Sequence, residues 1–107
     1  MSKTFEAIRQ LVASGEFRIS EHGYDELAED DIRVRALVDG LADARVVEDY
    51  PDFPKGPAVL VLHSDGRELP IHAVWGIPKG ESAPAVLVTA YRPDPARWHE
   101  GFMERRR

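Results

Sequence analysis

The chain has 107 residues, enough for one domain with a modest core, so we predict a single domain over residues 1–107. Its formal net charge of −5 argues against a broad basic surface for duplex nucleic acid, and the absence of cysteine excludes disulfides and thiolate metal sites. There is neither an apolar run that would cross a membrane nor an apolar signal segment at the start, so we expect a cytoplasmic protein without a membrane partner.

The first third of the chain predicts helices. Apolar residues at helical spacing indicate a helix over residues 4–14, followed by a short extended segment, Phe17–Ile19. Ser20 is a good N-cap for a short helix that reaches Leu27. Asp30 or Asp31 then offers a cap to a further helix over residues 32–41.

The remainder predicts an antiparallel sheet. The strand candidates are Arg45–Tyr50 at an edge, Ala58–Ser64, residues 68–75 and Ala85–Tyr91. Asp65-Gly66 is a strong signal for a two-residue hairpin turn, since both central positions of a type I′ turn need positive φ. Two prolines break the chain after Tyr91, and a final helix is predicted over residues 96–106.

The turn sets an expected register. It pairs Leu60 with Ile71, and matching apolar residues in the next hairpin then sets His72 beside Thr89. One face of the sheet is wholly apolar in this register: Ala58, Leu60, Leu62, Leu69, Ile71, Ala73, Trp75, Val86, Val88 and Ala90. We expect the helices to cover that face, which predicts a two-layer α+β fold with N-terminal helices on an antiparallel sheet.

The mixed face carries the candidate site, because His72, Thr89 and Tyr91 converge there. An imidazole titrates near neutrality and can move protons, and a tyrosine hydroxyl can donate to a developing charge. The alternative is that His72 is a half-buried strand histidine satisfied by a hydroxyl such as that of Thr89. His22 can cap a helix or line a cleft.

The other two histidines, His63 and His99, are expected to be solvated. No histidine pair has the spacing of a known zinc motif, so we expect no metal and no other cofactor.

Four stretches together resemble a known family: residues 19–22, 46–51, 69–74 and 88–94, with Trp98 beyond them. The pattern Thr-x-Tyr-x-Pro-Asp followed by tryptophan is the most specific part, and the chain from about Phe17 to Trp98 resembles the family called domain of unknown function 4258. That family is similar in architecture to small toxin ribonucleases of the RelE and MqsR kind.

The resemblance implies a RelE-toxin-like fold, metal-independent cleavage of RNA at the 2′-hydroxyl and neutralisation by a small antitoxin protein. It implies a catalytic set of His72, His22, Tyr91 and Thr89, with Arg92 holding a phosphate of the RNA substrate. The alternative function is a non-catalytic protein-interaction module that uses the mixed face. Residues 24–26 and 29–31 make the second predicted helix acidic, and RNA affinity draws much of its strength from cations.

Overall fold

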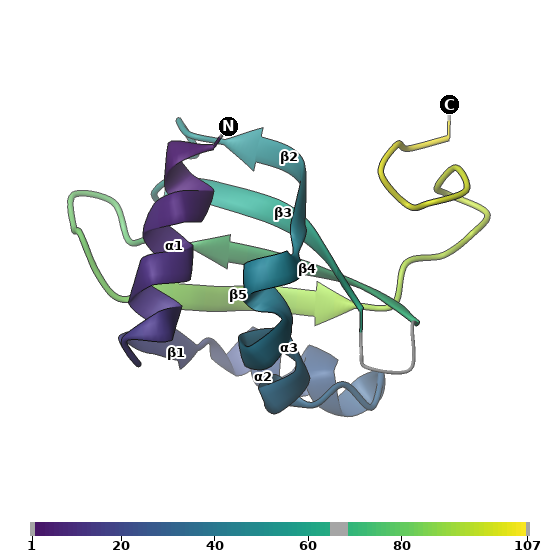
Figure 1. The fold of residues 1–107 in the computed structure, drawn as a ribbon, viewed down its shortest axis with the longest axis horizontal. Coiled ribbons are helices and arrows are strands. Elements are labelled where there is room, and N and C mark those ends of the chain that lie inside the picture. The colour runs from purple at the N-terminus through teal and green to yellow at the C-terminus, as the bar shows by residue number, and fades with distance from the viewer. Residues whose placement is uncertain (1, 65–68, 107) are drawn as a thin grey trace.

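The computed structural model describes residues 2–64 and 69–106, which form an α+β fold of helices and a five-stranded sheet (Figure 1). The elements are α1 Lys3–Ala13, β1 Phe17–Ile19, α2 Glu21–Glu29, α3 Val34–Gly40, the short 3-10 helix η1 Leu41–Asp43, β2 Arg45–Tyr50, β3 Ala58–Ser64, β4 Pro70–Gly76 and β5 Ala85–Tyr91.

The sheet is mixed, with strand order β1-β5-β4-β3-β2. Strands β2 to β5 pair as consecutive antiparallel neighbours, which confirms the predicted strand order and the edge position of β2. At the other edge β1 pairs parallel to β5, so the prediction of a purely antiparallel sheet is wrong there. A parallel pair needs a long crossover, and the chain between β1 and β5 provides it.

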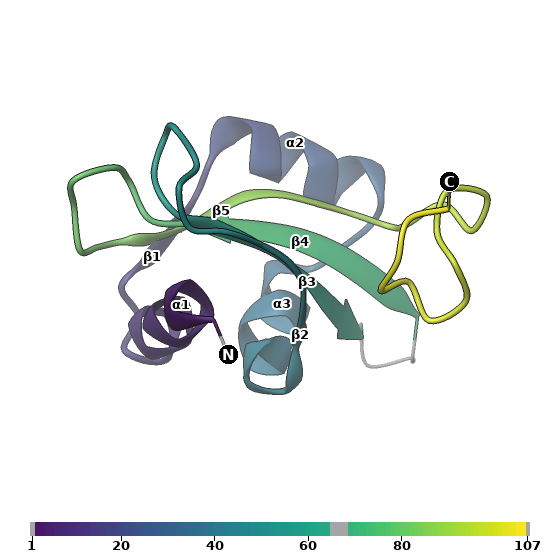
Figure 2. The same ribbon diagram turned by 90° about the horizontal axis from the view of Figure 1, so that it is seen from above.

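The helix α1 forms as its apolar spacing predicted. The Ser2 hydroxyl accepts a hydrogen bond from the Phe5 amide at 3.0 Å, which caps the helix. Phe5, Ile8 and Val12 are buried against the sheet. Figure 2 shows α1 and α3 on one side of the sheet and α2 towards the other.

The helix α2 lies along β5, where the short β1 ends. The hydroxyl of its N-cap, Ser20, accepts a hydrogen bond from the Gly23 amide and donates one to the Val88 carbonyl, both at 2.9 Å. Gly23 permits this approach, since a Cβ there would lie 2.9 Å from the Leu87 carbonyl oxygen. The edge of β5 beyond β1 is therefore covered by a helix, which protects it from pairing with another chain.

Neither Asp30 nor Asp31 caps the following helix, although one of them was predicted to do so. Asp30 is the C-cap of α2, and its carboxylate accepts a hydrogen bond from the Arg92 amide at 2.9 Å. The helix α3 begins only at Val34, after Arg33, which makes no side-chain capping bond. Across the described residues, no helix combines the length and the apolar character needed to span a bilayer.

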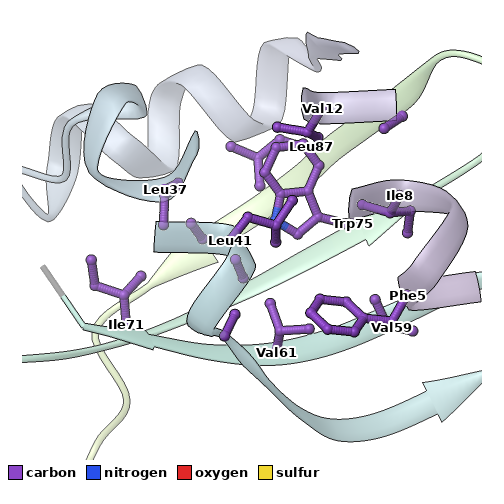
Figure 3. Close-up of a cluster of buried hydrophobic side chains, with 14 of the residues drawn as sticks. Phe5, Ile8, Val12, Leu37, Leu41, Val59, Val61, Ile71, Trp75 and Leu87 are labelled. Carbon is purple, nitrogen blue, oxygen red and sulfur yellow. The ribbon is translucent and has the colours of Figure 1, made fainter. Parts of the chain in front are cut away.

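The hydrophobic core lies between the sheet and the helices α1 and α3 (Figure 3). Trp75 and Ile71 on β4 are fully buried, as are Ile8 and Leu37 on the helices, as predicted. Phe17 on β1 adds an edge-on ring contact to Trp75, with 6.4 Å between ring centroids. The inward face of β4 is thus the predicted one.

The strand β3 turns the opposite face to the helices from the one predicted. Val59 and Val61 belong to the core, whereas the buried Leu60 lies on the other face. Ser64 pairs with Pro70, so the connection is three residues longer than the two-residue turn that we predicted. A shift by an odd number of residues exchanges the two faces of a strand. The predicted Asp65-Gly66 turn itself lies outside the described residues.

A β-bulge at Val88 divides β5. Thr89 pairs with Val74 and Leu87 pairs with Trp75, which leaves Val88 between two pairs. Its side chain is 40% exposed, so its predicted burial under the helices is wrong. Leu87 takes the core position instead.

The predicted C-terminal helix does not form. Residues 93–106, here called the C-terminal segment, fold back on themselves, with Trp98 and Arg105 paired as an isolated antiparallel bridge. Gly101 and Phe102 both have positive φ, of 89° and 60°, which a right-handed helix does not allow. Trp98 and Phe102 therefore do not share a helical face.

We expect Ile71→Ala to lower the free energy of unfolding by about 2–5 kcal/mol, because it removes buried methyl groups and leaves a cavity. The control Val88→Ala removes exposed methyl groups and should stay within about 0.5 kcal/mol of the unmodified protein. Chemical denaturation measures both. A loss below roughly 1 kcal/mol for Ile71→Ala would contradict the inward orientation of β4.

Candidate functional site

His72 lies on β4, on the sheet face that α1 and α3 leave uncovered, and it is fully buried. Its Nε2 lies 2.8 Å from the carbonyl oxygen of Phe102, and its Nδ1 lies 3.3 Å from the hydroxyl of Tyr91. A carbonyl can only accept, so Nε2 carries the proton of the neutral ring and Nδ1 accepts from Tyr91. Burial lowers the pKa of His72, which favours this neutral form.

Of the predicted partners of His72, Tyr91 is the one directly opposite. Their rings meet edge-on with centroids 5.4 Å apart, and burial raises the pKa of Tyr91, which keeps its hydroxyl protonated as a donor. Thr89 pairs with Val74 rather than with His72, so the predicted register is wrong by two residues at this point. A neighbouring hydroxyl therefore forms a hydrogen bond with His72, as the second of our two hypotheses predicted. The hydroxyl belongs to Tyr91, however, and not to Thr89.

The structure does not bring His22 to this pair. His22 is the second residue of α2, is exposed, and lies 3.4 Å from the carboxylate of Glu26. The Arg92 amide donates to Asp30 at the opposite end of α2, which lies eight residues from His22, or about 12 Å at 1.5 Å per residue. Within residues 2–64 and 69–106, no group of three or more His, Asp and Glu side chains is placed to hold a metal ion.

The C-terminal segment covers His72, which the prediction of a helix there did not anticipate. The Trp98 ring meets the imidazole edge-on at 4.4 Å, and the Phe102 carbonyl accepts the imidazole proton. The Arg105 guanidinium lies 4.7 Å above the Trp98 ring. His72 is therefore enclosed by groups of its own chain.

Glu48 and Tyr50 on β2 anchor this cover, and sequence reasoning missed them. The Glu48 carboxylate accepts hydrogen bonds from Arg105 at 2.9 and 3.2 Å and one from the Tyr50 hydroxyl. The Arg105 bonds hold the pKa of Glu48 below its usual value, while burial and the bond to Glu48 raise the pKa of Tyr50 to about 12. No local pattern in the sequence connects residues so far apart.

His63 is a second buried histidine, and the prediction that it is solvated is wrong. It is only 3% exposed, and neither ring nitrogen has a hydrogen-bond partner in the described structure. The reversed face of β3 turns it towards Gly40 at the end of α3. Burial without a partner lowers the pKa of His63 to about 4.

Part of this sheet face forms an apolar groove of about 460 Å³, here called the sheet groove. Its floor is one row of paired residues that crosses every strand: Tyr50, Ala58, Gly76, Val86 and Arg18. The remaining lining residues are Phe53, Lys55, Gly56, Val74, Ile77, Pro78 and Val88. The groove floor lies at the Gly76 end of β4, whereas His72 and its cover lie near the start of this strand.

Two loops close one end of the sheet groove. The Lys79 amide donates to the Lys55 carbonyl, and the Ile77 amide donates to the Pro57 carbonyl, both at 3.0 Å. Gly56 has φ +123°, and a Cβ there would lie 2.0 Å from the Ile77 carbonyl oxygen. The loops thus meet backbone to backbone, which holds this wall in place.

Comparison with known proteins gives a family and a partial similarity. The sequence model of the family described as "Domain of unknown function (DUF4258)" matches residues 19–92. The chain is 40% identical over 63 residues to the transcriptional repressor NrdR of Gluconobacter oxydans (strain 621H). That alignment covers 59% of this chain and 36% of the repressor, so the chain spans about a third of the length of this curated relative. No solved structure matches the chain.

We expect the protein to lose stability as the pH falls from about 6.5 towards 4. Unfolded His63 takes up a proton near pH 6.5, whereas folded His63 does so only near pH 4, so acid favours the unfolded chain. The difference amounts to about 3 kcal/mol at pH 4. Urea denaturation at pH 7.5 and pH 4 measures it.

His63→Leu should remove the His63 share of this acid-dependent loss, about 3 kcal/mol, because no proton can then bind at this position. His99→Leu is the matched control at an exposed histidine and should leave the loss in place. An unchanged pH dependence in His63→Leu would show that His63 is not responsible.

Proposed function

The chain belongs to the DUF4258 family, and we propose that this member is a non-catalytic protein-interaction module that binds its partner in the sheet groove. The observation that carries the proposal is an open apolar floor across all the strands of the sheet. Phe53 and Val88 expose 50% and 40% of their area there. Contiguous exposed apolar surface of this kind is typical of interaction sites.

The shape of the sheet groove supports binding of another chain. Ala58 and Gly76 leave the middle of the floor low, while Tyr50 and Arg18 stand at its two sides. Hydrogen bonds between the two loops hold the end wall in place, so binding a partner costs little conformational entropy in these loops. The similarity to part of a longer repressor adds support, because in that protein the related stretch is joined to further segments of the same chain.

A ribonuclease of a toxin–antitoxin pair, the function that the resemblance implies, has weaker support. Its supporting observation is the pairing of His72 with Tyr91. Both nitrogens of His72 are already bonded, and the C-terminal segment would have to leave before RNA could reach it. The antitoxin implied by the same resemblance is a protein partner, so it falls within the proposed function.

We expect Val88→Asp to abolish partner binding, because it places a charge beside the groove floor, at a side chain that is 40% exposed. Random decapeptides displayed on phage would be selected on the unmodified protein after depletion on Val88→Asp. Tyr24→Asp, at an exposed aromatic on α2 outside the groove, is the control and should retain the selected peptides. Failure to select any peptide that distinguishes Val88→Asp would contradict the proposed function.

We also expect neither the unmodified protein nor His72→Gln to cleave RNA, free or on ribosomes, because the imidazole is enclosed. A positioned acid or base contributes roughly 10²- to 10⁴-fold in rate. Cleavage by the unmodified protein that falls by such a factor in a folded His72→Gln would overturn the non-catalytic proposal.

A further inference from the structure

We infer that the occupant of the sheet groove is an extended peptide segment with an apolar centre and an acidic residue near each end. This inference rests on the proposed function and specifies the class of partner. It follows from the charges at the groove, the spacing of those charges and the shape of the floor.

The charged side chains at the groove favour an acidic partner. The chain has 19 acidic and 14 basic residues, yet the side chains that line the groove include two cations, Arg18 and Lys55, and no carboxylate. Both cations are exposed, and neither forms an ion pair with any described residue. Unpaired cations beside an apolar floor are complementary to a partner that carries acidic groups.

The spacing of the two cations is the second argument. Arg18 lies on β1 at one edge of the sheet, whereas the Lys55 carbonyl accepts a hydrogen bond from the Lys79 amide, just beyond the end of β4. Two gaps between neighbouring strands separate β1 from β4, which is about 10 Å at 4.8 Å per gap. An extended chain rises about 3.3 Å per residue, so at least about three residues separate the acidic positions of the partner.

The floor is the third argument. Ala58 and Gly76 occupy its middle, and a Cβ on Gly76 would lie 3.3 Å from the Pro57 carbonyl oxygen, so the centre stays low. Val74 and Val88 border this depression. A large apolar side chain at the centre of the segment would fill it and lose contact with water, which favours binding.

The test uses decapeptides with one apolar centre and either two glutamates or two lysines at each end. We expect the acidic peptide to bind the unmodified protein at least ten-fold more tightly at low salt, with the preference shrinking at high salt. The double variant Arg18→Glu/Lys55→Glu should reverse the preference. The control variant Lys3→Glu/Arg33→Glu changes the net charge by the same amount at exposed positions outside the groove, and it should keep the preference for the acidic peptide. Fluorescence anisotropy measures each affinity.

The outcomes separate this inference from the proposed function. If Val88→Asp abolishes binding but the acidic and basic peptides bind equally well, the inference of an acidic segment is wrong and the proposed interaction module is retained. Absence of any Val88-dependent binding would overturn both. A dimer of the unmodified protein that Val88→Asp disrupts, seen by sedimentation, would assign the groove to a second copy and overturn the peptide inference.

Discussion

The burial of Trp75 and Ile71 against α1 and α3 is the constraint on which the rest of the structure depends. Side chains alternate along a strand, so once these residues face the helices, His72 and Val74 must face the other way. The register of each neighbouring strand then decides which of its side chains lie on the same face. In β5, the bulge at Val88 shifts this register partway along the strand. One core contact thus decides what the second face of the sheet displays.

The second face is divided into two parts that have different physical character. At one end, His72 is enclosed by Trp98, Phe102 and Tyr91, and the ion pair of Arg105 with Glu48 holds the cover in place. At the other end, the described residues that line the sheet groove belong to strands and loops, and none belongs to a helix. The C-terminal segment covers His72, whereas the open part is apolar and has two cations, Arg18 and Lys55, among its lining residues.

This division favours recognition over proton transfer. A general acid or base needs a nitrogen within reach of the substrate, and both nitrogens of His72 are bonded within the chain. His72 contributes instead to the attachment of the C-terminal segment, as a donor to the Phe102 carbonyl. The acidic α2 beside the end of β5 also repels a phosphate backbone, whereas Arg18 and Lys55 at the groove attract acidic groups.

The sequence by itself determined most of the local elements, since caps and apolar periodicity are properties of neighbouring residues, but it predicted a helix where the C-terminal segment folds back on itself. It was sufficient for α1, for β2 to β5 and for the inward face of β4, and its family motifs are those of the DUF4258 match. Only the tertiary structure decided the parallel pairing of β1, the face of β3 and the enclosure of His72. Those features depend on loop length, on a one-residue bulge and on contacts between distant residues. A shift of one residue in any of them exchanges the faces of a strand, and no local pattern records that shift.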